Sequence, residues 1–282
     1  MTVYVGAIER DVVTIAGSEA ADYLQGQVSQ DVHALAVDDA AWTFVLSPQG
    51  KVDGWGRVHR IDAETYELDV DPGAGADVVA RLQRFLLRTK AEITLQESVP
   101  GVAVRGVEPA GALPIAAADG VGGDVLRAKV GDLPADVADA ADDDGAALES
   151  MRIRSGIPAW GREIDHDTIP ATLGQRVIDA SVSFTKGCYT GQELVARIDS
   201  RGGNVPRRRC GFTSPGPGPG RGDAVVVDGK DVGVVTSDAL DPTTGQPIGL
   251  AFVQRSVDVP ADATVDGNAI RLVPLPFGFV DA

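Results

Sequence analysis

Residues 184–197 carry the most distinctive run of the chain, Phe184-Thr-Lys-Gly-Cys-Tyr-Thr-Gly-Gln-Glu-Leu-Val-Ala-Arg197. Thr190 and Glu193 have the spacing of a capping box, which predicts a helix that begins after Thr190. Cys188 lies two residues before that cap, where free backbone amides and the cation of Lys186 would favour a thiolate. The pattern indicates a reactive, partly exposed cysteine. The alternative is a small residue in a tight turn, with Glu193 serving only as a cap.

The composition limits the class of protein. The 282 residues include 41 acidic and 25 basic side chains, so the formal net charge is −16, and 44% of the residues are hydrophobic. This length and hydrophobic content predict two folded domains. The acidity argues against direct nucleic-acid binding and against docking on anionic lipid. The sequence shows neither a secretory leader nor an apolar run of about 18 residues, so we expect a cytoplasmic protein without a membrane partner.

Cysteine and histidine are too few and too scattered for a metal site. Cys188 and Cys210 do not make a disulfide scaffold, and no CxxC pair is present. The run Asp142–Asp144 lacks the spacing of a calcium loop and is typical of a solvated loop. We therefore predict no metal centre, and we interpret Cys210, in an apolar strand, as a core residue.

Hydrophobic periodicity predicts an α+β fold. A small β-barrel is expected from residue 204 onward, where valine runs flank the turn Asp228-Gly229. Residues 78–86 have helical spacing, and Arg81, Arg84 and Arg88 fall on the face that we expect to be solvated. The remaining expected elements are strands at 11–15, 42–46, 52–61, 65–70, 91–95 and 182–184, and helices at 18–24 and 146–155.

Four motifs resemble those of the YgfZ family, folate-binding proteins related to the T-protein (aminomethyltransferase) of the glycine cleavage system. They are the octapeptide Lys186–Glu193, Tyr23–Val32, Ser47–Lys51, and Arg154–Pro158 followed by Trp160-Gly161 and Ile169-Pro170. The resemblance implies a T-protein-like folate-binding body over 1–203 and a C-terminal barrel over 204–282. Two interleaved subdomains are expected in the body, one formed by 1–45 with 98–203 and the other by 46–97.

The resemblance also implies a function. YgfZ-like proteins assist iron–sulfur cluster assembly or repair in client enzymes, including tRNA-modifying ones, and they depend on the motif cysteine. We therefore expect tetrahydrofolate as the cofactor, iron–sulfur enzymes or assembly proteins as partners, and Cys188 at the rim of a folate cavity with Lys186 beside it. The residues expected to bind the cofactor are Gln27, Lys51, Arg154, Tyr189, Gln192, Glu193 and Arg197. Four of the expected site residues, Lys51, Arg154, Lys186 and Arg197, would form a local positive field against an acidic surface.

Two departures from the transferase pattern argue against an enzyme. Gly54 and Trp55 stand where the transferase has a pair of aspartates, and Asp53 is one residue out of register. Arg154 stands where the transferase has a glutamate that grips the pterin, so this guanidinium would instead face the glutamate tail of folate. The alternatives are a folate-dependent one-carbon transferase and a thiol redox or partner-binding protein with a vestigial folate cavity.

Overall fold

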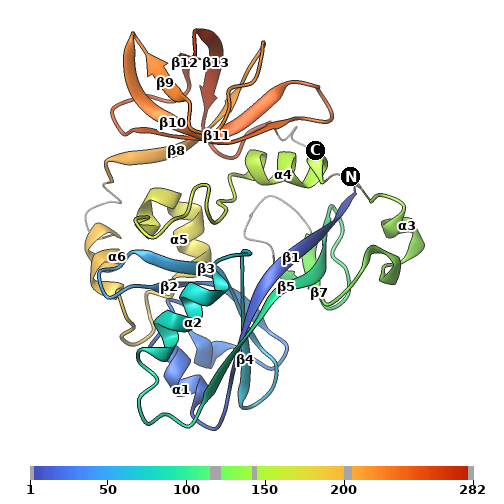
Figure 1. Ribbon diagram of the computed structural model, residues 1–282, viewed down its shortest axis with the longest axis vertical. Helices are drawn as coiled ribbons and strands as arrows, with labels where there is room; N and C mark the ends of the chain where they lie inside the picture. Colours follow the sequence, from blue (N-terminus) through green and yellow to red (C-terminus); the bar gives the residue numbers. More distant parts are fainter. Residues whose placement is uncertain (1–2, 115–121, 142–144, 200–204, 279–282) are drawn as a thin grey trace.

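A computed structural model describes residues 3–114, 122–141, 145–199 and 205–278. The α+β fold predicted from the sequence is confirmed. A mixed body carries the N-terminal strands, a six-stranded barrel forms the C-terminal end, and α4 and α5 lie between them (Figure 1). The run Asp142–Asp144 lies outside the described residues. No helix of the described part of the chain is long and apolar enough to cross a membrane.

The body is built on a seven-stranded sheet in the order β2-β3-β4-β1-β5-β7-β6. The long strand β1 is central and pairs antiparallel with β4 on one side and β5 on the other. The sheet strands are β1 (Tyr4–Ala16), β2 (Ala40–Leu46), β3 (Val52–Arg60), β4 (Thr65–Val70), β5 (Glu92–Arg105), β6 (Leu113–Pro114) and β7 (Gly122–Leu126).

Six helices accompany the strands in the described part of the chain. They are α1 (Ala20–Gln25), α2 (Gly75–Gln83), α3 (Ala135–Ala138), α4 (Ala146–Ser155), α5 (Gln175–Ser181) and α6 (Gln192–Asp199). The prediction for residues 146–155 is confirmed, whereas α2 begins three residues before the predicted start. The helix expected at 18–24 is present as α1, which begins at Ala20 and ends at Gln25.

The helices α1 and α2 cover one face of the sheet. Val78 and Leu82 of α2 are fully buried in a cluster with Leu24 of α1, Val13 of β1 and other strand residues. Gly54 makes this approach possible, because a Cβ there would lie 2.4 Å from Val78 Cγ2. The helical spacing of the apolar residues in this segment therefore does mark the face that packs on the sheet.

A second cluster joins the β2–β3 hairpin to α5. Trp42 and Trp55 stack with ring centroids 4.2 Å apart, and Val177 and Ile178 of α5 pack against the same group. The predicted strand at 182–184 is wrong, since α5 ends at Ser181 and the chain continues as an irregular loop. Short apolar runs do not distinguish a strand from a helix end, which explains the error.

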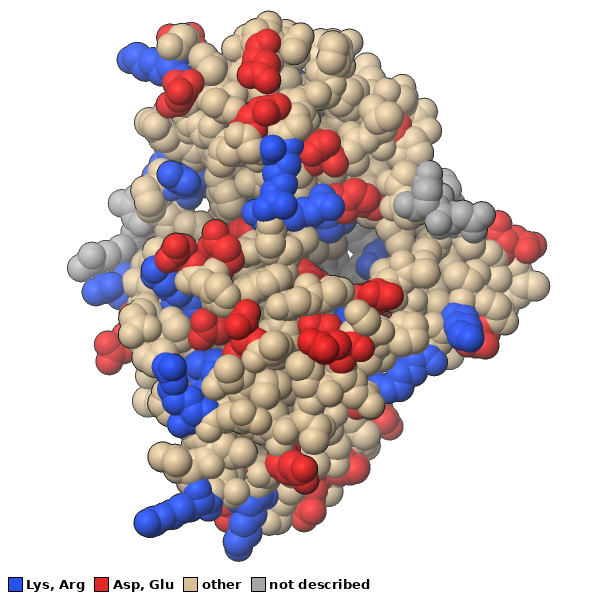
Figure 2. Space-filling model, in the orientation of Figure 1, with Lys and Arg blue, Asp and Glu red and all other residues tan. Residues whose placement is uncertain are grey.

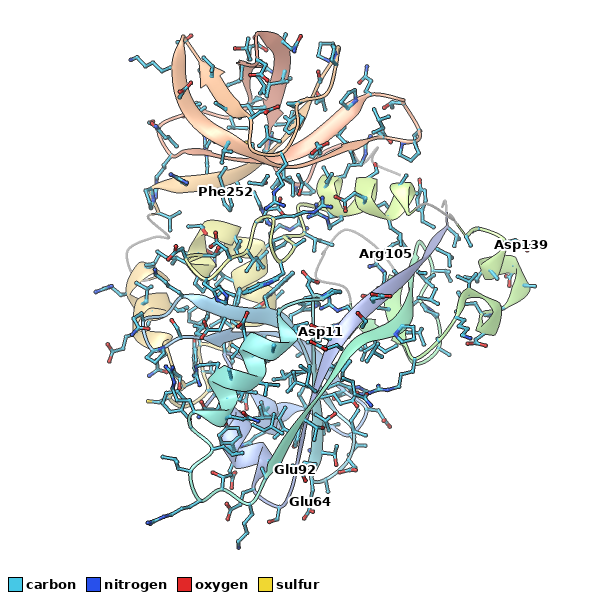
Figure 3. All side chains as sticks on the ribbon, in the orientation of Figure 1. Asp11, Glu64, Glu92, Arg105, Asp139 and Phe252 are labelled. Carbon is cyan, nitrogen blue, oxygen red and sulfur yellow. The ribbon has the colours of Figure 1, made fainter. Side chains whose placement is uncertain are left out.

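The C-terminal barrel is closed, in the order β10-β11-β8-β13-β12-β9. Cys210 is 1% exposed in its core, which confirms the interpretation of this cysteine as a core residue. Phe252 points from the barrel toward the body and packs against the second cluster (Figure 3). The barrel strands are β8 (Arg207–Thr213), β9 (Ala224–Val227), β10 (Lys230–Leu240), β11 (Pro247–Gln254), β12 (Ala261–Val265) and β13 (Asn268–Val273).

An ion pair between Arg152 of α4 and Glu163 is hydrogen-bonded to the barrel. Arg152 donates to Glu163 (3.1 Å) and to Ser237 Oγ of β10 (2.7 Å), and Ser237 donates to the other oxygen of Glu163 (2.6 Å).

Basic and acidic side chains are interspersed over the face seen in Figure 2, which is hollowed between the barrel and the body. The net negative charge is therefore not a single continuous acidic patch on this face.

Candidate functional site

Cys188 lies on the loop between α5 and α6, and its side chain is exposed. The neighbouring Lys186 fastens this loop to the N-terminal motif. Its Nζ donates to the backbone carbonyls of Gln25 (2.7 Å), Val28 (2.8 Å) and Gln30 (2.8 Å). An ammonium has three N–H groups, so these carbonyls are its partners rather than the cysteine sulfur.

The environment of Lys186 is only partly open to water. Burial lowers the pKa of its ammonium to about 8. Its Nζ also lies 5.2 Å from the centroid of the Tyr189 ring, a cation–π distance. Lys186 thus positions the loop that presents Cys188, which is a different role from the thiol partner that the sequence suggested.

Further backbone contacts join the cysteine loop to the N-terminal motif. Thr190 N–H donates to Gly26 O (3.1 Å), and Ser183 N–H donates to Ser29 O (3.0 Å). In return the Ser29 hydroxyl donates to Ser181 O (2.6 Å). The two motifs, about 160 residues apart in the chain, therefore form one substructure.

The hairpin turn at residues 47–51 packs on the same loop. Gly191 has φ +82°, and a Cβ there would lie 2.6 Å from Ser47 O. A Cβ at Gly50 would likewise lie 2.6 Å from Leu194 Cβ. Only glycine allows both the left-handed backbone and this close approach. Three of the four motifs singled out in the sequence thus meet around Cys188.

The helix after the cysteine begins at Gln192, as the sequence predicts. Gln192 Oε1 accepts from Tyr189 N–H (3.2 Å), while the Thr190 hydroxyl is directed toward Gly26 O (3.5 Å). Tyr189 is 9% exposed and packs in the second hydrophobic cluster, and burial raises its pKa to about 12. Glu193 and Arg197 are exposed on α6.

Arg81 belongs to this region, contrary to the sequence-based expectation. It was expected on a solvated helix face, but its side chain is 4% exposed. Its Nε donates to Leu46 O (2.7 Å) and its Nη1 donates to Gln27 Oε1 (3.1 Å). Gln27 is therefore held by Arg81 beneath the hairpin turn. A buried arginine on the apolar side of a helix has no signature in hydrophobic periodicity.

Carboxylates lie next to this arginine. Asp53 is 3.9 Å from Arg81 Nε and 3.9 Å from His166 Nδ1, and burial raises its pKa. His166 Nε2 is 3.3 Å from Asp77. Lys51 donates to Asp167 (2.5 Å), so the segment just before Ile169-Pro170, the end of the fourth motif, lies against the same hairpin turn.

Arg154 does not lie with these residues. Its guanidinium pairs with Asp241 of the barrel, donates to Gly278 O (3.0 Å) and lies 5.8 Å from the Phe277 ring centroid. The expectation that Arg154 faces the glutamate tail of folate is therefore corrected, because its charge is used at the body–barrel junction. Arg154 therefore does not contribute to the positive field that we expected around the ligand.

Gly54 and Trp55, where the resemblance implies aspartates in the transferase, are part of the core. Trp55 is 3% exposed, and its indole N–H donates to Ser181 Oγ (2.9 Å). Gly54 lies against Val78, as described above. Neither position offers a carboxylate, so a general base cannot act from them.

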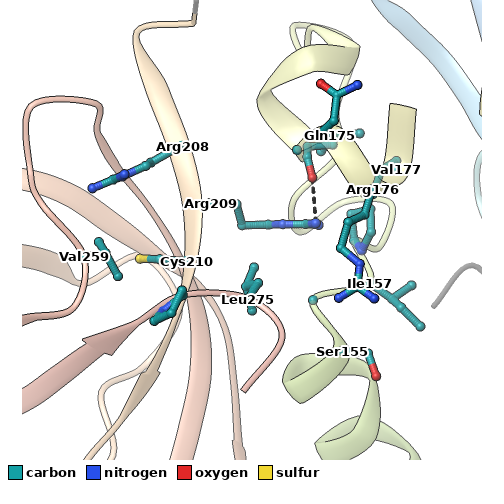
Figure 4. Close-up of a pocket in the computed structure, with 15 residues that line it drawn as sticks. Ser155, Ile157, Gln175, Arg176, Val177, Arg208, Arg209, Cys210, Val259 and Leu275 are labelled. Carbon is teal, nitrogen blue, oxygen red and sulfur yellow. Dashed lines mark hydrogen bonds between the residues drawn. The ribbon is translucent and has the colours of Figure 1, made fainter. Parts of the chain in front are cut away.

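A cavity of about 340 Å³ lies elsewhere, between the body and the barrel (Figure 4). It is bounded by the end of α4, the start of α5 and strand β8, and Cys188 is not among the residues that line it. Among the described residues, no group of three or more histidine, cysteine or acidic side chains is arranged to hold a metal ion.

Comparison with known proteins explains this architecture. The barrel, residues 207–278, matches the family described as the glycine cleavage T-protein C-terminal barrel domain. The crystal structure of glycine cleavage system aminomethyltransferase T from Bartonella henselae superimposes with a TM-score of 0.74 at 17% identity, over 98% of this chain and 86% of that chain. The chain has the T-protein fold. The predicted T-protein-like body with a C-terminal barrel is thus confirmed.

Sequence relatives of this chain include an uncharacterised protein and several aminomethyltransferases. An uncharacterised protein of Haemophilus influenzae is 27% identical over 208 residues, 72% of this chain and 71% of the relative. Aminomethyltransferases of Rubrobacter xylanophilus and Cutibacterium acnes are 32% and 34% identical, over 46% and 47% of this chain. The aligned stretch spans only about a third of the length of those two enzymes.

Proposed function

We propose that this T-protein-like chain binds tetrahydrofolate and assists iron–sulfur cluster assembly or repair in client enzymes through the thiol of Cys188. The fold and the aminomethyltransferase relatives support a folate-related role. The observation that carries the proposal is the presentation of Cys188, an exposed thiol on a loop fastened by the three bonds of Lys186.

The filled transferase positions support an accessory role over catalysis of aminomethyl transfer. Positions 54 and 55 carry glycine and tryptophan, so neither supplies a carboxylate. Trp55 packs in the core, and the absence of a side chain at Gly54 lets Val78 of α2 pack against the strand. A cluster-assembly factor needs a reachable soft ligand or nucleophile, and a thiolate supplies it. A single cysteine holds a cluster only with further ligands, which a client or an assembly protein would supply.

Folate requires a carboxylate for the pterin, whose amino and ring N–H groups are donors. Arg154 cannot serve and is committed to Asp241. Asp53 has a side chain that is 19% exposed, and it lies 3.9 Å from Arg81, which donates to Gln27 of the N-terminal motif. We assign pterin recognition to Asp53, so Asp53→Asn should weaken tetrahydrofolate binding about tenfold, as expected for loss of a charge-assisted hydrogen bond.

Rescue of a strain lacking the protein tests the role of the thiol. Cys188→Ser should fail to restore iron–sulfur enzyme activity while retaining the fold and tetrahydrofolate binding. Cys210→Ala, which changes the other cysteine in the barrel core, is the matched control and should rescue. Full rescue by Cys188→Ser would remove the thiol from the mechanism, and aminomethyl transfer by the purified protein would favour the one-carbon transferase instead.

A further inference from the structure

The cavity between body and barrel has walls of two kinds. Apolar side chains from both parts line it, among them Ile157, Leu173, Val259 and Leu275. Two arginines, Arg209 from strand β8 and Arg176 from α5, extend into the same space (Figure 4). Its volume, about 340 Å³, falls in the range of small-molecule pockets, roughly 300–1,000 Å³.

Arg209 is poorly compensated for a buried cation. Its Nη2 donates to Leu173 O (2.7 Å), but its Nε and Nη1 are buried and have no hydrogen-bond partner among the residues that the structure describes. Buried polar groups in folded proteins are nearly always bonded, so each exception calls for an explanation. A ligand that accepts from these N–H groups would provide one.

The charges around Arg209 leave room for an anion. None of the fifteen described residues that line the cavity is acidic. The carboxylate that acts on Arg209 is Glu163, and its oxygens already accept from Arg152 (3.1 Å), Ser237 (2.6 Å) and Ala159 N–H (3.1 Å). Burial accordingly lowers the pKa of Arg209 to about 10, a sign of a cation without a close counter-ion.

Thiol chemistry does not account for the cavity. Cys210 lines it, but burial raises the pKa of this thiol to about 12, which leaves it inert at neutral pH. The cavity is therefore a place for binding rather than for covalent chemistry.

We propose that this cavity binds a small organic acid, separately from tetrahydrofolate. The carboxylate is held by the unpartnered N–H groups of Arg209, and the apolar remainder lies against Ile157 and Leu275. A guanidinium offers two parallel N–H groups that match a carboxylate, and the apolar walls select against inorganic anions. Because the ligand bridges β8 and the segment after α4, its binding also joins the barrel to the body.

Benzoate and benzamide are a matched pair of probes that differ in the carboxylate. Titration followed by NMR of the full chain should show benzoate binding with a Kd on the order of 1 mM, and benzamide at least about tenfold weaker. Arg209→Met should weaken benzoate at least about tenfold. Arg207→Met changes an exposed arginine two positions away on the same strand and should leave the affinity unchanged.

A second variant guards against misfolding of Arg209→Met. Val259→Phe keeps the arginine but fills the cavity, and it should also abolish benzoate binding. Equal affinity for benzoate and benzamide, or undiminished benzoate binding by Arg209→Met, would overturn the proposal. Displacement of benzoate by saturating tetrahydrofolate would place folate in this cavity and overturn the assignment of a separate site.

Discussion

Replacement of Lys186 by methionine tests how the cysteine loop is held. The variant removes three charge-assisted hydrogen bonds to Gln25, Val28 and Gln30 but keeps an apolar stem beside Tyr189. A hydrogen bond to a charged group contributes about 1.5–3 kcal/mol, and water replaces part of it at this half-buried site. We therefore expect a loss of about 2–4 kcal/mol in the free energy of unfolding.

Urea unfolding and amide hydrogen exchange measure this effect globally and locally. Amide exchange at residues 26–30 and 186–190 should accelerate in Lys186→Met, because the hydrogen bonds from the Lys186 ammonium that join these two segments are lost. Lys90→Met is the control, since Lys90 is 78% exposed and pairs with Glu19 only at 3.9 Å. It should change stability by less than about 1 kcal/mol. If Lys186→Met lowers the free energy of unfolding by less than about 1 kcal/mol and does not accelerate exchange at residues 26–30, Lys186 does not hold the cysteine loop on the N-terminal motif.

Other consequences can be measured with the same preparations. Gly191→Ala should cost about 2–4 kcal/mol, because the residue has φ +82° and its Cβ would meet Ser47 O; Gly187→Ala, with open space around it, should be nearly neutral. Arg57→Met should cost about 3–5 kcal/mol, because it breaks two buried ion pairs at once and leaves Asp69 with Arg10 and Asp124 with Arg105 as their remaining partners. An unfolding loss under about 1 kcal/mol would contradict that reasoning. Arg57 also holds the pKa of both these carboxyls below the ordinary 3.8, so the folded state binds fewer protons than the unfolded state, and the free energy of unfolding should fall as pH drops below about 4. An acid titration without that fall would be inconsistent with the pairing.

The sequence indicated the fold and the exposure of Cys188 for physical reasons that a single chain carries. Strand alternation located most of the body sheet. The motif around Cys188 predicted an exposed thiol before a helix, and both features are present. These patterns involve residues that are close together in the chain, so they can be recognised without the tertiary structure.

Side-chain partners across the chain were beyond such local signals. Arg81 was expected in solvent, yet it is buried because Leu46 O and Gln27 meet it from other elements. Arg154 was expected at a ligand, yet Asp241, 87 residues away, takes its charge. A guanidinium looks the same in sequence whether it faces water, a ligand or a buried carboxylate, and only the packing decides among them.

Equilibrium binding of tetrahydrofolate to the purified chain tests the central claim most directly. Saturable binding of one molecule per chain is predicted, retained in Cys188→Ser and weakened about tenfold in Asp53→Asn. Absence of binding up to about 1 mM tetrahydrofolate would contradict a folate-dependent function, whatever the reactivity of Cys188.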